Sequence, residues 1–140
     1  MTATRALIIL DIDDFKLVND RHGHQTGDAV LRALGEVVRA NCRDSDEAAR
    51  YGGEELAVVL PGATLERAHE VAERIRAAIA AHRFPATGGV ELRVTASVGV
   101  AAVGSGGGHA ELLAAADAAL YAAKRGGKNR TVAHAWPRAA

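Results

Sequence analysis

The sequence has almost no cysteine, the residue that cross-links small secreted domains, and it has no long apolar run. It contains a single cysteine, Cys42, so no disulfide can form within the chain. No apolar stretch approaches the roughly 20 residues of a membrane-spanning helix, and Leu7 to Leu10 is too short for a signal peptide. We therefore expect a cytoplasmic protein with no membrane segment in this chain.

A surplus of positive or negative charge is also missing, because 17 basic residues balance 17 acidic ones. Proteins that coat nucleic acid need a surplus of positive charge, so we expect no nucleic-acid partner. A chain of 140 residues fits one domain, and a domain of this size buries roughly 68–70% of its unfolded surface. We expect residues 1–140 to form that single domain, with 135–140 as a loose tail.

An acidic cluster follows the first apolar run. Leu7 to Leu10 reads as a buried strand, and Asp11-Ile12-Asp13-Asp14 ends it abruptly. Alternation along an extended chain places Asp11 and Asp13 on one face and Ile12 on the other. The pattern indicates a strand whose end emerges into a site.

A second acidic cluster lies in Arg50 to Leu56, where Glu54 and Glu55 follow Gly52-Gly53. Paired glycines between two strands predict a two-residue hairpin loop with both glycines at positive φ. A hairpin tip without Cβ atoms lets a bulky ligand approach the backbone. Carboxylates at two neighbouring strand ends are the ligands that Mg²⁺ prefers, and phosphoryl chemistry on nucleotides uses metals held in this way.

Hydrophobic periodicity predicts helices separated by strands. We expect strands at Ala6–Leu10, on both sides of Gly52-Gly53, at Glu91–Val103 and at the edge segment Thr131–His134, helices at Gly27–Ala40, from Thr64 to about His82 and at Ala110–Lys124, and loops at Asn41–Glu47, Pro85–Gly89 and Gly104–Gly108. Interleaved helices and a largely antiparallel sheet suggest an α/β sandwich of the palm type.

Five motifs in order resemble the GGDEF family, the diguanylate cyclases. They are Asp11 to Asp20, Gly23 to Asp28, Arg50 to Leu56, Thr95 to Val100 and Ala116 to Lys124. The third is the variant of the signature with Glu in third place. The resemblance covers about Leu7 to Val132, and five ordered motifs are far more specific than one.

The resemblance implies a palm-type, nucleotide cyclase-like sandwich and a metal-dependent reaction. Across a homodimer, two GTP would condense into cyclic di-GMP with release of two pyrophosphates. Asp11, Glu54 and the backbone carbonyl of Ile12 match the ligands of Mg²⁺ or Mn²⁺. Glu54 also matches the proposed proton acceptor, and Glu55 would support the site. Without the motifs, the acids at 11, 13 and 14 would read as a solvated strand end.

The remaining matches concern the nucleotide. Asn19 and Asp28 match the guanine-recognising pair, and His24 matches a residue that lines the pocket. The phosphate contacts match the backbone of Phe15 and Lys16 and the side chains of Lys124 and Lys128. From the residues alone, Asp28 is also explained as a helix-start carboxylate and Lys124 as a helix-end cation. For His24, a structural hydrogen bond is as good an explanation as ligand contact.

Arg43, Asp46 and Arg74 match an inhibitory site for the cyclic di-GMP product. Arginine can bind the O6 and N7 edge of guanine or a phosphate, and Asp46 can accept from guanine N1–H and N2–H₂. Read in isolation, Arg43 to Asp46 is simply a polar loop.

The chain departs from the family at three places. Leu56 stands where Phe is usual, Lys128 stands where Arg is more common, and only Met1 to Arg5 precede the first strand. We expect Leu56 to point into the core, and we expect the usual N-terminal helical segment to be absent, by truncation or by nature. Two other readings stay open, namely a weak or inactive module that binds GTP or cyclic di-GMP, and a purely structural dimerisation domain.

Overall fold

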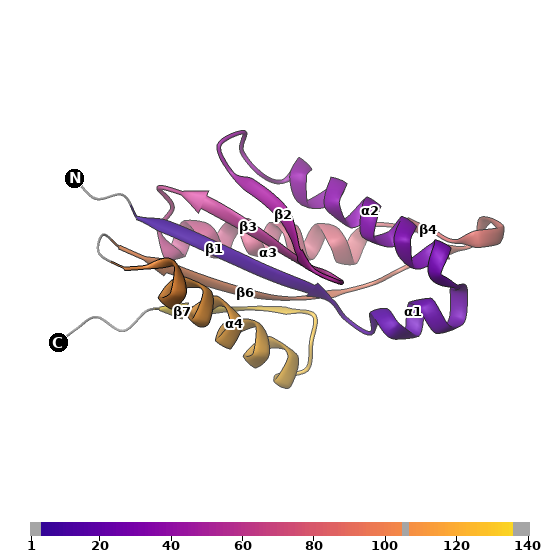
Figure 1. Ribbon diagram of the computed structural model, residues 1–140. Helices are drawn as coiled ribbons and strands as arrows, with labels where there is room; N and C mark the ends of the chain where they lie inside the picture. The colour runs from indigo at the N-terminus through magenta and orange to yellow at the C-terminus, as the bar shows by residue number, and fades with distance from the viewer. Residues whose placement is uncertain (1–3, 105–106, 136–140) are drawn as a thin grey trace.

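A five-stranded sheet forms the centre of the computed structural model, which describes residues 4–104 and 107–135 (Figure 1). In sheet order the strands are β2 (Glu47–Gly52), β3 (Glu55–Pro61), β1 (Arg5–Ile12), β6 (Ala96–Val103) and β7 (Arg130–Ala135). Every neighbouring pair is antiparallel except β6 and β7, which are parallel. The predictions of a largely antiparallel sheet and of an edge strand at its end are confirmed.

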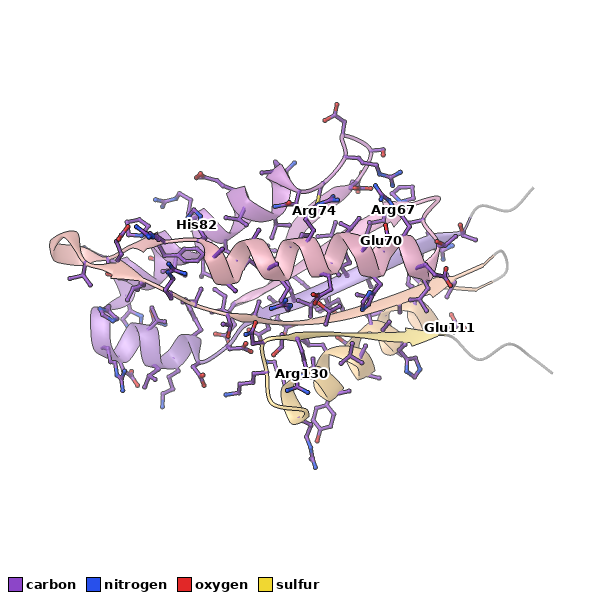
Figure 2. All side chains as sticks on the ribbon, turned by 180° about the vertical axis from the view of Figure 1, so that it is seen from behind. Arg67, Glu70, Arg74, His82, Glu111 and Arg130 are labelled. Carbon is purple, nitrogen blue, oxygen red and sulfur yellow. The ribbon has the colours of Figure 1, made fainter. Side chains whose placement is uncertain are left out.

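Helices cover both faces of this sheet, as the opposite views in Figures 1 and 2 show. The helices are α1 (Phe15–His22), α2 (His24–Ala40), α3 (Leu65–Ala81) and α4 (His109–Arg125). Side chains of α2 and α3 pack on one face, and α4 packs on the other. The predicted α/β sandwich is therefore correct. None of the helices in the described ranges is both long and apolar enough to cross a bilayer.

The central strand β1 supplies both halves of the core by alternation. Ile8 and Leu10 pack toward α2 and α3, whereas Leu7 and Ile9 pack toward α4. Burying each such side chain contributes about 1.5–3 kcal/mol. Strand β6 is buried on both faces, and at Gly99 a methyl group would overlap the backbone of α4. This close approach fixes the middle of α4 against β6.

Several sequence-based assignments were wrong, including the loop predicted over Pro85–Gly89. The helix α1 was not predicted, and α2 begins at His24 rather than Gly27. The segment predicted as one strand over Glu91–Val103 is divided, because Arg93 to Thr95 separate the two-residue β5 (Glu91–Leu92) from β6. The short strand β5 pairs with β4 (Phe84–Pro85) across a 3₁₀ turn, η1 (Thr87–Gly89).

The connections follow local chemistry. Thr64 caps α3, its hydroxyl accepting from the Arg67 amide at 3.2 Å, and Gly126 caps the end of α4. In the loop predicted over 104–108, the Gly107 amide donates to the Gly104 carbonyl at 3.2 Å, and residues 105–106 lie outside the described ranges. Ala135 belongs to β7, so the tail was predicted one residue too early, and 136–140 also lie outside the description.

Candidate active site

Four chain segments meet at one end of the sheet. They are the end of β1, the tip of the β2–β3 hairpin, the start of α1 and the end of α4 (Figure 1). Asp11, the last residue but one of β1, pairs in register with Glu55 of β3. Asp11 is only 3% exposed, whereas Glu54 and Glu55 are half-buried. The predicted pair Asp11 and Glu54 is thus brought to one place, with Glu55 directly across from Asp11.

These carboxylates repel one another. Burial raises the pKa of Glu54 and of Glu55, and the charge of Asp11 raises both further. Like charges opposite each other on neighbouring strands are destabilising. The Lys124 ammonium offsets part of this repulsion, because it contacts Oδ2 of Asp11. The other oxygen, Oδ1, is buried and has no hydrogen-bond partner among the described residues.

The donor set fits a hard divalent cation. Two or three carboxylates with one lysine leave net negative charge, and the unpartnered Oδ1 of Asp11 is an acceptor in need of a cation. Within the described ranges, no three His, Cys, Asp or Glu side chains are already arranged as ligands of one ion. A cation here would therefore be held by Asp11 and Glu54 with a backbone oxygen such as that of Ile12, as the motif implies.

The hairpin differs from the prediction in its turn. Gly52 ends β2 and pairs with Glu55, so Gly53 and Glu54 form the turn, and neither glycine has a positive φ. The backbone rationale for the two glycines was therefore wrong. A methyl group at either position would meet nothing within 4 Å. The glycines therefore leave the hairpin surface open. The Arg50 side chain donates a hydrogen bond to the Gly53 carbonyl in the turn.

The predicted phosphate loop is the first turn of α1. Asp14 precedes the helix with φ 56°, so the amides of Phe15 and Lys16 are the first of the helix. The first amides of a helix have no acceptor within it, and they attract anions. The ring of Phe15 packs against the core, and Lys16 is exposed. The two side chains thus have different environments, whereas both backbone amides lie in the first turn of α1.

The side chain of Asn19 in α1 lies against Gly27, the residue that precedes Asp28 in α2. Gly23, at φ 88°, separates α1 from α2, and a methyl group at Gly27 would overlap the side-chain oxygen of Asn19. Glycine at position 27 therefore leaves room for the Asn19 side chain against α2. Because α2 begins at His24, Asp28 lies beyond the first turn, and the helix dipole does not explain it. His24 is exposed.

A hollow of about 430 Å³ adjoins Asp28 and is also lined by Leu31, Arg32 and Arg50. The sequence prediction missed these three as site residues. Leu31 and Arg32 stand three and four positions after Asp28, so helical spacing alone could have identified them. Arg50 comes from β2, and no local pattern connects it with α2.

Lys128 and Asp13 lie at a second corner of the site. Lys128 Nζ lies 2.7 Å from Asp14 Oδ1, and this contact raises the pKa of Lys128. Asp13 is 7% exposed and accepts from Thr95 Oγ1, Ser97 Oγ and the Asn129 amide at 2.6–2.9 Å. Because its oxygens are occupied, Asp13 fixes the corner and is not available as a ligand.

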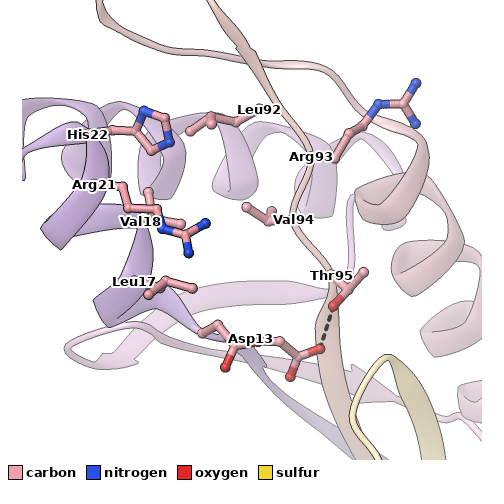
Figure 3. Close-up of a pocket in the computed structure, with 10 residues that line it drawn as sticks. Asp13, Leu17, Val18, Arg21, His22, Leu92, Arg93, Val94 and Thr95 are labelled. Atoms are coloured by element: carbon pink, nitrogen blue, oxygen red, sulfur yellow. Dashed lines mark hydrogen bonds between the residues drawn. The ribbon is translucent and has the colours of Figure 1, made fainter.

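A further hollow of about 290 Å³ lies between α1 and the segment before β6, with Asp13 and Thr95 at one end (Figure 3). Leu17 and Val18 of α1 face Val94 across it. None of the residues predicted to contact the nucleotide lines this space.

Of the predicted inhibitory residues, Arg43 and Arg74 of α3 are exposed, whereas Asp46 is buried. Arg43 Nη2 lies 2.8 Å from Asp46 Oδ1, and Arg74, labelled in Figure 2, donates to the Asn41 carbonyl at 2.7 Å. Burial acts to raise the pKa of Asp46, but the hydrogen bonds from Arg43 outweigh it and lower the value. The Asp46 side chain is 1% exposed, so it serves as the partner of Arg43 and not as the open acceptor that the sequence suggested.

The first comparison concerns sequence. The model of a family described as "Diguanylate cyclase, GGDEF domain" matches residues 2–130. The diguanylate cyclase DgcP of Pseudomonas aeruginosa is 44% identical over 124 residues, which are 89% of this chain and 18% of DgcP. The chain therefore spans a small part of that relative.

Solved structures agree with the sequence comparison. The GGDEF domain of DgcB from Caulobacter crescentus, in complex with c-di-GMP, has a TM-score of 0.88 at 39% identity and covers 93% of this chain and 77% of that one. The active GGEEF domain of a diguanylate cyclase from Vibrio cholerae has a TM-score of 0.86 at 34% identity, covering 98% and 85%. The fold is thus that of the palm-like nucleotide cyclase domains. The chain belongs to the GGDEF family of diguanylate cyclases.

Proposed function

We propose that this domain condenses two GTP into cyclic di-GMP, with Mg²⁺ or Mn²⁺, in the cytoplasm. The observation that carries the proposal is the group of carboxylates at Asp11, Glu54 and Glu55 beside an open glycine turn. In each half-reaction, the 3′-oxygen of one GTP forms a bond to the α-phosphorus of the other. The bond from that phosphorus to the bridging oxygen breaks, and pyrophosphate leaves.

The residues divide this work by their positions. Bound metal would neutralise triphosphate charge and acidify the attacking hydroxyl. Glu54 is half-buried with a raised pKa, which suits a group that accepts the hydroxyl proton. The α1 amides and the lysines at 124 and 128 would hold phosphate oxygens. Lys128 carries the charge of the more common arginine without its bidentate fork.

Base selection rests on Asp28 and Asn19. A carboxylate accepts from guanine N1–H and N2–H₂ together, and adenine has no such donor pair. The hollow beside Asp28 offers the space for a base. His24 would contact the nucleotide only at its margin, because it is exposed. Leu56 does not favour an inactive module, because it packs in the core as predicted and exchanges one apolar side chain for another.

The reaction joins two nucleotides, so two domains, each with one GTP, must face each other as a homodimer. Product would inhibit through Arg43, with Arg74 nearby and Asp46 holding the guanidinium in place. The relative DgcB, solved with c-di-GMP, supports affinity of the family fold for that product.

Incubation of the purified chain with GTP and Mg²⁺ or Mn²⁺ tests the proposal. Chromatography should show cyclic di-GMP and pyrophosphate in a 1:2 ratio, and ATP in place of GTP should give no cyclic product. GTP binding without any product would instead favour a regulatory module.

A further inference from the structure

Backbone strain in the described ranges is concentrated at one corner of the site. The only non-glycine residues there with positive φ are Asp14 at 56°, Lys128 at 67° and Asn129 at 45°. Such conformations are unfavourable for residues other than glycine and persist only where the surroundings enforce them. Two of the three are joined directly, through the ion pair of Lys128 with Asp14. The strained turn after α4 thus holds the Lys128 amine beside Asp14, which directly precedes α1.

Besides the ion pair with Asp14 and the hydrogen bond of the Lys128 amide to the Ala123 carbonyl at 3.0 Å, three contacts hold this turn. The Asn129 amide donates to Asp13 at 2.9 Å, and Arg130 Nε donates to the Lys128 carbonyl at 3.1 Å. The third contact comes from outside the site, because Arg76 of α3 donates from Nη1 to Oδ1 of Asn129 at 2.8 Å. It is the contact that ties the Asn129 side chain to a helix packed in the core.

Arg76 is itself held rigidly for this contact. Its Nε and Nη2 donate to the two carboxylate oxygens of Glu73 at 2.7 and 3.1 Å, and these hydrogen bonds lower the pKa of Glu73. A planar fork bound at two points leaves the third nitrogen fixed in direction. The same helix carries a second pair with equal spacing, Arg67 and Glu70, labelled in Figure 2. That pair does not contact the strained turn.

We propose that Arg76 is a positioning residue for the triphosphate of the nucleotide. It acts through Asn129, whose side chain it holds, and so keeps the turn in the conformation that directs Lys128 toward the β- and γ-phosphates. The inference rests on the proposed function, and it adds α3 to the groups that control phosphate binding. It predicts no effect on guanine, because Asp28 and the hollow beside it lie on other elements.

The test separates the two ends of the ligand. Calorimetry would measure binding of 3′-deoxy-GTP with Mg²⁺, which cannot react because it lacks the attacking hydroxyl, and binding of GMP, which lacks the outer phosphates. Arg76→Met should weaken 3′-deoxy-GTP by about threefold to tenfold and leave GMP affinity unchanged. Arg67→Met, the matched control, should change neither. Asn129→Gly keeps a residue that tolerates positive φ and removes the side-chain amide that Arg76 contacts. This variant should therefore reproduce the Arg76→Met result. The double variant should lose little more affinity than either single variant.

The outcomes distinguish the role. Equal loss for 3′-deoxy-GTP and GMP would show a general structural effect and overturn the inference, as would an unchanged affinity for both. Additive losses in the double variant would show that Arg76 does not act through Asn129. If Arg76→Met does not fold, Asn129→Gly decides alone. A wild-type chain that binds 3′-deoxy-GTP but makes no cyclic di-GMP from GTP contradicts the proposed reaction. The binding test of Arg76 stays valid in that case. One that binds neither nucleotide contradicts both.

Discussion

The ammonium group of Lys124 contacts the carboxylate of Asp11, although 113 positions separate the two residues in sequence. Asp11 is almost fully buried, and Lys124 remains 40% exposed at the end of α4. The lysine therefore occupies one oxygen of a predicted metal ligand. In the proposed reaction, binding of metal and triphosphate would transfer Lys124 from Asp11 to the phosphates.

Removal of Lys124 should have opposite effects on two ligands. Lys124→Ala removes a competing cation from Asp11, so binding of Mn²⁺ alone should strengthen by about twofold to fivefold, the range of a partly exposed ion pair. Binding of 3′-deoxy-GTP with Mg²⁺ should weaken, because a phosphate contact is lost. Calorimetry measures both. Arg125→Ala, which removes the next cation of the helix, is the control, and a decrease in Mn²⁺ affinity on Lys124→Ala would contradict this account.

Guanine recognition should depend on one carboxylate of α2. Asp28→Ala should weaken binding of GMP by about 1–3 kcal/mol, because guanine N1–H and N2–H₂ lose their acceptor. Glu36→Ala removes a second exposed carboxylate from the same helix and should have no effect. Titration of GMP into each protein gives the comparison. Matching affinities for wild type and Asp28→Ala would show that the base binds elsewhere.

The ion pair at the predicted inhibitory site should give a pH-dependent stability. The pKa of Asp46 in the folded protein lies below its ordinary value of 3.8. Its contribution is therefore present at pH values above 3.8 and is lost as the pH falls through the lower folded value. Asp46→Asn should reduce the free energy of unfolding by about 1–3 kcal/mol at pH 7, and by much less at acid pH. Urea unfolding of this variant and of Asp44→Asn, an exposed neighbour, measures the difference. A loss that is equal at both pH values would rule out the ionic origin.

Product inhibition should depend on Arg43 if the separate site controls the enzyme. Initial rates would be measured across added cyclic di-GMP for wild type and for Arg43→Ala. Relief of inhibition in the variant is the expected result, because the exposed guanidinium is lost while Asp11, Asp28 and Glu54 are untouched. Superimposable inhibition curves would indicate that product competes at the GTP site instead.

The sequence predicted the elements that carry strong local patterns. The alternation of β1, the stripe of α3 and the acidic clusters at Asp11 and Glu54 all appear where expected. Helix α1 was missed because it has only 8 residues and none of them is fully buried, so it shows no apolar stripe. The glycines at 52 and 53 were assigned positive φ from a hairpin rule, but the turn falls one residue later and obeys another geometry.

Other features depend on contacts between distant segments, which no local pattern encodes. The pairing of Lys124 with Asp11 requires α4 to cross the sheet at Gly99, and Arg50 reaches the hollow at Asp28 only through sheet pairing. The hold of Arg76 on Asn129 is of the same kind. Motif matches placed most candidate residues at one end of the sheet, but the structure was needed to show which of them already have partners.

The most direct test of the central claim compares wild type with Glu54→Gln in the conversion of GTP to cyclic di-GMP. The amide keeps the shape of the side chain but cannot accept the hydroxyl proton, and it is a poor ligand for a hard cation. Glu70→Gln, on the surface of α3, provides the control, and circular dichroism checks the fold of each protein. We predict product from wild type and from Glu70→Gln, and none from a folded Glu54→Gln variant. Turnover by Glu54→Gln at the wild-type rate would contradict the assignment of this carboxylate site as the catalytic centre.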